Sequence, residues 1–180
     1  QSSYGAQKAV CELLVHDYAR KGFVDGRSLR LPTVTVRPGK PNKAASSFAS
    51  GIIREPLAGV EAACPVDAST RMWLVSPRTV VDSLIAGYEA PASALPPSHA
   101  VNVPGISVTV GEMVDALRRV AGDAVAGRVV FRHDETIDRI VRTWPRDFDA
   151  KVGRALGMRT DASFEAIVRQ YVEHDMPKRA

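Results

Sequence analysis

Short apolar, β-branched runs alternate along this chain with longer amphipathic stretches, and this alternation constrains the fold more than any other feature. Residues 28–36, 59–74, 100–103 and 128–132 have the composition of strands, with a strand pair expected within 59–74. The segments around them have helical periodicity. Strands that alternate with helices favour an α/β fold in which some strands form a parallel sheet, so we expect an α/β chain.

Capping residues, glycines and prolines predict where the helices begin and end. Ser2 is a natural N-cap for the first helix, and Pro56 is expected to end the second. Ser76 followed by Pro77 opens the third helix, and Thr109 starts a capping box. The expected helices lie at about residues 4–21, 45–55, 77–90, 110–120, 135–143, 148–156 and 162–173.

A proline interrupts the first expected strand. Leu31, Val34 and Val36 are apolar enough for a buried strand. Pro32 has no amide donor, so we expect regular pairing to end near it and Thr33 to lie at the rim of the sheet.

Composition excludes several classes of protein. The chain has 24 Lys and Arg against 20 Asp and Glu. The basic residues form no continuous run, so we expect no nucleic-acid partner. The sequence has no apolar segment of roughly 20 residues and no signal pattern, which predicts a cytoplasmic protein without a membrane partner. The apolar neighbours of Cys11 favour a small buried side chain, and neither Cys11 nor Cys64 has metal-type spacing, so no metal is expected.

Several other side chains are interpreted as structural. Trp73 and Trp144 are predicted to be packing anchors, and Arg54 is predicted to have a structural role beside Glu55. The four histidines show no metal-ligand spacing.

The pattern with most chemical content is Tyr4-x-x-x-Lys8. Residues four apart on a helix project from the same face, within one turn of each other. An ammonium beside a phenol favours the phenolate, which makes the tyrosine usable as an acid or base. By itself the spacing is weak, and a solvated Tyr-Lys pair is the simpler interpretation.

Further motifs extend this pattern. Ser2-Ser-Tyr-Gly-Ala-Gln-Lys-Ala9, with the strand residues Leu29-Arg-Leu-Pro-Thr33, resembles the extended short-chain dehydrogenase/reductase family of NAD-dependent epimerases and dehydratases. Within this family, residues 37–42 and 45–57 are most similar to dehydrogenases that oxidise a four-carbon sugar acid with NAD. The resemblance covers nearly the whole chain. It implies an NAD-dependent oxidoreductase, with a nucleoside-diphosphate-sugar epimerase or dehydratase as the alternative.

The resemblance also implies roles for particular residues near the cofactor. Tyr4 would be the catalytic acid/base, and Lys8 would bind the nicotinamide ribose and favour ionised Tyr4. Leu31, Pro32 and Thr33 would border the nicotinamide ring, with Thr33 also near the reacting carbon. NAD is implied by the resemblance alone, and NADP remains open.

The substrate would contact a second group of residues. Arg71 occupies the place where sugar-nucleotide members of the family bind a phosphate, and a guanidinium suits a carboxylate equally well. The alternative for Arg71 is a surface ion pair with Asp67 or Glu61. Ser47 and Phe48 would line a small polar pocket, or would equally suit the start of a helix.

None of the 13 glycines forms the Gly-rich turn on which this family binds the cofactor pyrophosphate. The chain is therefore expected to be the C-terminal part of a Rossmann-type fold with a smaller mixed α/β substrate lobe. Residues 1–36 would be a remnant of the NAD-binding domain and 37–180 mainly the substrate lobe, with 76–104 returning a helix and a strand to the Rossmann sheet. The intact enzyme would be a homodimer, whereas the chain alone would be inactive. A non-catalytic binding or assembly fragment is the remaining alternative.

Overall fold

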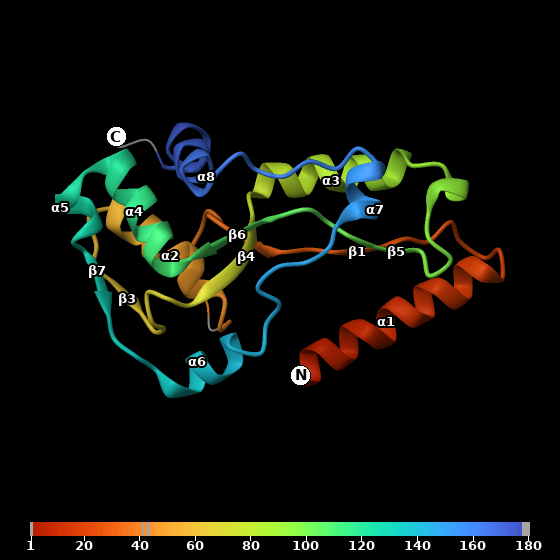
Figure 1. The fold of residues 1–180 in the computed structure, drawn as a ribbon, viewed down its shortest axis with the longest axis horizontal. Coiled ribbons are helices and arrows are strands. Elements are labelled where there is room, and N and C mark those ends of the chain that lie inside the picture. Colours follow the sequence, from red (N-terminus) through yellow and green to blue (C-terminus); the bar gives the residue numbers. More distant parts are fainter. Residues whose placement is uncertain (1, 41, 43, 178–180) are drawn as a thin grey trace.

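The computed structural model describes residues 2–40, 42 and 44–177 as a mixture of helices and short strands (Figure 1). In chain order the elements are α1 (Ser3–Arg20), β1 (Ser28–Arg30), β2 (Thr33–Val34), α2 (Ser47–Leu57), β3 (Ala62–Cys64), β4 (Arg71–Val75), α3 (Pro77–Glu89), the 3-10 turn η1 (Ala92–Ala94), β5 (Ala100–Asn102), β6 (Ile106–Thr109), α4 (Val110–Ala121), α5 (Asp123–Ala126), β7 (Val129–Phe131), α6 (Glu135–Val141), α7 (Lys151–Ala155), α8 (Phe164–Gln170) and the π-helical turn η2 (Tyr171–Asp175). The predicted α/β class is confirmed.

The strands pair in three small sheets within the described residues. β1 pairs in parallel with β5, and β3 pairs in parallel with β7. β4 lies between β2, which is parallel to it, and β6, which is antiparallel. The expectation of a strand pair within residues 59–74 is wrong, because β3 and β4 belong to different sheets. Their partners are set by long-range packing, which a local apolar pattern does not encode.

The chain changes its pairing partner at Pro32. β1 ends before this residue and pairs with β5, whereas β2 begins after it and pairs with β4. The predicted interruption is therefore confirmed, since a proline cannot donate to either neighbour. Thr33 is half-buried and pairs with Leu74 on β4, and β2 is the outer strand of its sheet in the order β2–β4–β6. Leu31 lies in the unpaired break and is 41% exposed, so the expectation that it is buried is wrong.

Helices begin where the predicted caps lie. Ser2 Oγ accepts a hydrogen bond from the Gly5 amide, and Ser76 Oγ accepts one from the Thr79 amide before α3. Thr109 forms both hydrogen bonds of a capping box at the start of α4.

The ends of helices differ more from expectation. α2 does not stop before Pro56 but runs on to Leu57, two residues beyond its expected end. The last three predicted helices are shorter in the structure, and a π-helical turn follows α8. β6 and the short α5 were not predicted, although residues 106–109 alternate between apolar and polar side chains.

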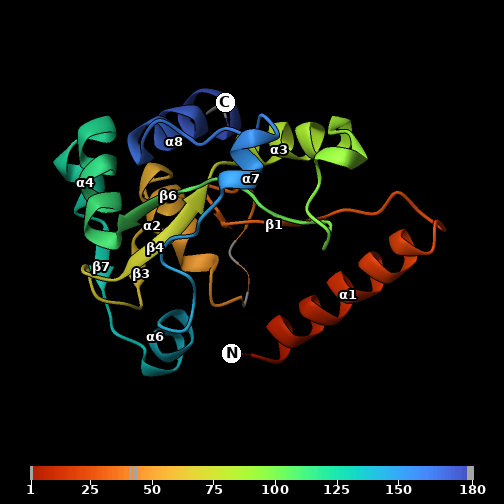
Figure 2. The ribbon, with the colours of Figure 1, turned by 45° about the vertical axis from the view of Figure 1, so that its right-hand side comes forward.

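The main hydrophobic core lies between the β2–β4–β6 sheet and helices α2, α4 and α8 (Figures 1 and 2). Its fully buried residues include Ile52, Leu74, Met113 and Ile167. A smaller cluster forms around Val101, Val103 and Met158, beside β1, α3 and α7. The two clusters hold the strand ends that carry the candidate site.

Helix α1 lies to one side of the body, with its N-terminal end pointing toward α6 in both ribbon views (Figures 1 and 2). None of its residues is buried. The expectation that Cys11 is buried is therefore wrong, because no described segment packs over it. No helix in the described part of the chain is long and apolar enough to cross a membrane.

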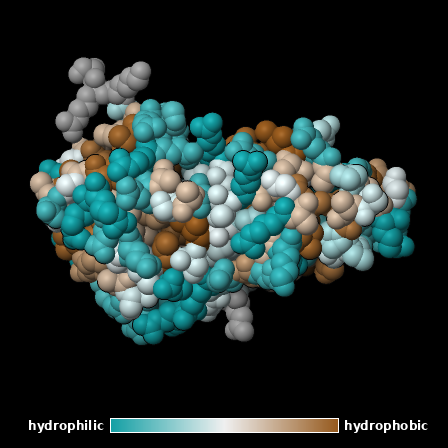
Figure 3. Space-filling model, turned by 45° about the horizontal axis from the view of Figure 1, so that its top comes forward, coloured by the Kyte–Doolittle hydropathy of each residue, from teal (hydrophilic) through white to brown (hydrophobic). Residues whose placement is uncertain are grey.

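Apolar side chains reach the surface on α1 and on α3. Figure 3 shows brown, hydrophobic surface on the half of the molecule that carries these two helices. The exposed apolar residues of the two helices are Tyr4, Val10, Leu13, Leu14 and Tyr18 on α1 and Val81, Leu84, Ile85 and Tyr88 on α3.

Candidate functional site

A groove of about 710 Å³ lies between the first half of α1 and strand β1. Its lining brings together three of the residues that the sequence predicts for catalysis and cofactor binding, namely Tyr4, Lys8 and Leu31. The other described lining residues are Gly5, Ala9, Cys11, Glu12, Val15, Ser28, Leu29, Arg30, Trp73, Pro145 and Phe148. A volume of this size is typical of pockets for small molecules and cofactors.

Tyr4 and Lys8 lie one turn apart on the same face of α1, as their spacing predicts. The Lys8 Nζ atom lies 5.4 Å from the centre of the Tyr4 ring. The Tyr4 side chain is 68% exposed, so its phenol is open to a ligand in the groove. The Ser2 cap starts the helix immediately before Tyr4 and holds the tyrosine in the first helical turn.

An ion pair joins the two walls of the groove. Arg30 on β1 donates two hydrogen bonds to the Glu12 carboxylate on α1, at 2.8 Å from Nε and 2.5 Å from Nη2. These hydrogen bonds lower the pKa of Glu12. The pair sets the distance between the helix that carries Tyr4 and the strand that precedes Pro32.

Two aromatic rings form another part of the groove wall. Trp73 on β4 and Phe148, which precedes α7, stack with ring centres 5.2 Å apart and planes 24° apart. Trp73 is 7% exposed. The sequence predicted a packing role for Trp73 and no role for Phe148, although Trp73 follows Arg71 by two residues and shares its face of the strand.

A second, smaller hollow of about 220 Å³ contains Arg71. Arg142 and Arg146 also line it, so three guanidinium groups gather beside the single acidic residue Asp67 among its described lining. Arg71 donates a hydrogen bond to the Ser107 carbonyl at 3.1 Å. Arg142 is paired with Asp138 at 2.7 Å, so Arg71 and Arg146 beside Asp67 give the hollow only a small positive excess. Sequence reasoning missed two of its three arginines because they lie far from Arg71 in the chain.

Glu61, one of the two acidic partners considered for Arg71, is paired with Arg132 at 2.6 Å. The described residues contain no group of three or more His, Cys, Asp or Glu side chains that could hold a metal ion.

The remaining predicted residues lie outside the described linings of both hollows. Pro32 is buried, and Phe48 at the start of α2 is 9% exposed and belongs to the main core. Ser47 Oγ accepts a hydrogen bond from the Asn42 amide at 3.1 Å. Thr33 pairs with Leu74 in the sheet.

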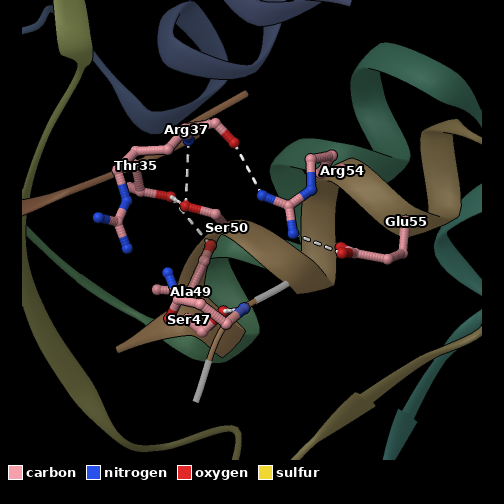
Figure 4. A network of polar contacts seen from close by, with 8 residues as sticks. Thr35, Arg37, Ser47, Ala49, Ser50, Arg54 and Glu55 are labelled. Atoms are coloured by element: carbon pink, nitrogen blue, oxygen red, sulfur yellow. Dashed lines mark hydrogen bonds and ion pairs between the residues drawn. The ribbon is translucent and has the colours of Figure 1, made fainter. Parts of the chain in front are cut away.

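A buried polar network ties the segment after β2 to α2 (Figure 4). Thr35 Oγ1 donates to the Ala49 carbonyl at 2.9 Å, and the Arg37 amide donates to Ser50 Oγ at 3.1 Å. Arg54 donates to the Arg37 carbonyl at 2.9 Å and pairs with Glu55 at 2.6 Å. Arg54 thus has the structural partners that the sequence analysis favoured.

Comparisons with known proteins agree on one group of relatives. A D-erythronate dehydrogenase of Cupriavidus necator is 57% identical over 173 residues, which cover 96% of this chain and 53% of the relative. A D-erythronate dehydrogenase of Haemophilus influenzae is 51% identical over 176 residues, which cover 98% of this chain and 56% of the relative. The chain therefore spans about half the length of the relatives it matches. No protein-family model matches the sequence.

A solved structure has the same fold. It is described as a nucleoside-diphosphate-sugar epimerase from Agrobacterium tumefaciens, and it superposes with a TM-score of 0.91 at 47% identity. The match covers 96% of this chain and 51% of that one. The predicted resemblance and the Rossmann-type α/β fold are both confirmed.

Proposed function

We propose that this chain carries the catalytic pair and the substrate lobe of a sugar-acid dehydrogenase of the extended short-chain dehydrogenase/reductase family, because it is similar to the two dehydrogenases and to the epimerase structure described above. The substrate is D-erythronate or a similar small sugar acid, as the names of the two dehydrogenase relatives suggest. Residues 1–36 complete the NAD-binding domain, 37–180 form mainly the substrate lobe, and 76–104 return a helix and a strand to the Rossmann sheet. The parallel pairing of β1 with β5 supports this division.

The single observation that carries the proposal is that Tyr4 and Lys8 share one face of α1 and open into one groove. In the proposed reaction the Tyr4 phenolate accepts the proton of the substrate hydroxyl while hydride leaves the same carbon. The Lys8 ammonium lies 5.4 Å from the centre of the tyrosine ring and binds the nicotinamide ribose.

The residues around the groove fit a nicotinamide group. Leu31 offers an apolar side chain at the groove wall, and the Tyr4 and Lys8 polar ends lie on the opposite helix. Pro32 and Thr33 continue the strand that would border the ring. NAD supplies the hydride acceptor when it is bound. NAD is preferred over NADP on the resemblance to the relatives.

Substrate binding is assigned to Arg71, Ser47, Phe48 and Thr33. The Arg71 guanidinium lies among two further arginines, which supports a carboxylate-binding role. Ser47 and Phe48 begin α2, which the buried network of Figure 4 ties to the segment after Thr33.

A nucleoside-diphosphate-sugar epimerase is the second candidate. The description of the Agrobacterium tumefaciens structure favours it, and the three-arginine hollow would suit a diphosphate as well as a carboxylate. NADH release separates the two, because a dehydrogenase produces it in every turnover and an epimerase regenerates its cofactor.

The exposed apolar faces of α1 and α3 support two further proposals about the intact enzyme. One is that they contact the rest of the NAD-binding domain, and the other is that the enzyme is a homodimer paired through α1. A non-catalytic assembly role would use the same faces. The cytoplasmic location stays a prediction.

The test uses a chimera in which this chain replaces the matching half of the Cupriavidus necator dehydrogenase. Tyr4→Phe should lower kcat for D-erythronate oxidation by about a hundredfold or more, the usual contribution of a positioned acid/base. NAD affinity, measured by calorimetry, should stay nearly unchanged. Tyr18→Phe on the same helix is the matched control, since Tyr18 is also exposed and lies outside the described lining of the groove.

Two results would contradict the proposal. An undiminished kcat in the Tyr4→Phe chimera would show that Tyr4 is not the catalytic acid/base. A folded chimera that binds NAD but forms no NADH from D-erythronate would remove the dehydrogenase activity, and turnover of a nucleoside-diphosphate sugar would then favour the epimerase.

A further inference from the structure

The stacked rings of Trp73 and Phe148 line one of the two hollows that make up the proposed substrate site, and Arg71 lines the other. Both rings line the groove that contains Tyr4 and Lys8. Arg71 shares the face of β4 that carries Trp73, because residues two apart on a strand point the same way. Pro145 lines the groove and Arg146 lines the hollow of Arg71, so one short segment borders both.

Hydrogen bonds hold this segment on each side of Phe148. Ser107 Oγ, in register with Trp73 on the neighbouring strand, donates to the Arg146 carbonyl at 2.6 Å. Asn102 Nδ2 donates to the Asp149 carbonyl at 3.0 Å. Side chains from two different strands therefore hold the backbone on each side of Phe148 before any ligand binds, and a site held this way discriminates better than a loose one.

The Trp73 ring is also fixed from behind. A methyl group at Gly105 would lie 2.7 Å from the indole Nε1, closer than side chains approach, so the backbone itself packs against the ring. The indole cannot retreat in that direction to admit a bulkier ligand. Trp73 and Phe148 together form an apolar wall of the groove that Tyr4 also lines.

We propose that the Trp73–Phe148 stack determines which sugar acids the site accepts. This inference rests on the proposed function. The carbon chain of a short acid packs its C–H face on the rings, with the reacting hydroxyl toward Tyr4 and the carboxylate toward Arg71. The stack borders the path between these two ends, so a carbon chain longer than that of D-erythronate, the acid named for the relatives, meets the ring of Phe148.

The test compares chain-length preference in the chimera described above. Phe148→Ala removes the more exposed ring, which is 37% exposed, and should raise kcat/KM for a five-carbon relative to a four-carbon acid about tenfold, the lower end of what one methylene contributes. Phe131→Ala is the matched control, since Phe131 is 46% exposed and lies on β7, outside the described lining. It should leave the ratio within about twofold. Phe148→Leu, which keeps an apolar side chain, covers the case in which the alanine variant fails to fold.

If a folded, active Phe148 variant kept the same ratio of kcat/KM values for the two acids, the proposal would be overturned. The failure of the proposed function has a different signature, in which the unsubstituted chimera oxidises neither acid. In that case the Kd values of the same two acids, measured by calorimetry, test the inference without relying on turnover. A Kd ratio that changes in the Phe148 variant but not in Phe131→Ala supports the wall, and a ratio that changes in neither, or no binding of either acid, overturns it.

Discussion

Replacement of Gly105 by alanine should destabilise the protein, because three groups approach this glycine closely. An added Cβ would lie 2.7 Å from the Leu74 carbonyl oxygen, from Cγ of Pro32 and from Nε1 of Trp73. Two of these groups are a strand backbone and a proline ring, which cannot swing aside as the end of a flexible side chain can. The glycine is therefore required by close packing, and not by its backbone conformation.

The size of the effect follows from overpacking. Extra methyl groups in a packed interior cost about 1 to 3 kcal/mol, and three simultaneous contacts with rigid groups place Gly105→Ala at about 2 to 3 kcal/mol. At about 150 to 250 residues each kcal/mol lowers the melting temperature by about 2 to 4 °C, and the shift shrinks in proportion as the chain lengthens. In a chimera about twice as long as this chain we therefore expect a decrease of about 2 to 6 °C.

Thermal unfolding of the chimera, followed by circular dichroism, measures this decrease. Gly5→Ala is the matched control, because its Cβ would have its nearest neighbour, Ser2 Oγ, at an ordinary 3.4 Å. Alanine also favours the helix interior by about 1 kcal/mol, so the control should melt at the same temperature or slightly higher. Equal melting temperatures for Gly105→Ala and the unsubstituted chimera would refute the packing argument.

Two further predictions concern titratable side chains. Because hydrogen bonds from Arg30 lower the pKa of Glu12, their stabilising contribution is complete above the ordinary glutamate value of 4.5 and is lost as the pH falls through the lowered value. The protection of α1 against hydrogen exchange, taken relative to the intrinsic rate at each pH, should therefore fall below about pH 4 in the unsubstituted chain and change less in Glu12→Gln, and equal pH dependence of protection in both would contradict the role of the pair. Burial raises the pKa of the Cys64 thiol, so in a Cys11→Ser background Cys64 should react with a thiol reagent at pH 8 only after unfolding, and fast labelling of the folded protein would contradict its burial.

Local features of the chain were predictable from sequence, because their causes are local. The caps at Ser2, Ser76 and Thr109 each satisfy an amide within three residues, and the structure shows the same hydrogen bonds. The break at Pro32 follows equally from one residue, which has no donor. The end of α2 was misjudged, because the helix continues through Pro56 to Leu57.

Features that depend on distant parts of the chain were not predictable in the same way. The pairing of β3 with β7 joins segments about 67 residues apart, shown by the register of Ala62 with Val129. Cys11 was expected to be buried from its apolar neighbours, but burial depends on what packs over a helix face.

The candidate site likewise combines features that follow from local sequence with features that depend on distant parts of the chain. The placement of Tyr4 beside Lys8 follows from helical spacing, and the structure has it. The stack of Trp73 on Phe148 brings together β4 and a segment 75 residues later, so neither ring could be assigned to the groove from local pattern. The same holds for Arg146 beside Arg71.

The position of the catalytic helix depends on contacts that the described residues supply only in part. The Glu12–Arg30 pair is half exposed on the arginine side, and an exposed ion pair contributes at most about 1 kcal/mol. Burial of one leucine contributes about 1.5 to 3 kcal/mol, and α1 leaves Leu13 and Leu14 more than half exposed. A protein surface that covered these two residues would therefore hold α1 more firmly than the ion pair does. In the proposed reaction Tyr4 acts on a substrate packed against the Trp73–Phe148 stack, so the precision of that reaction would depend on such a covering surface.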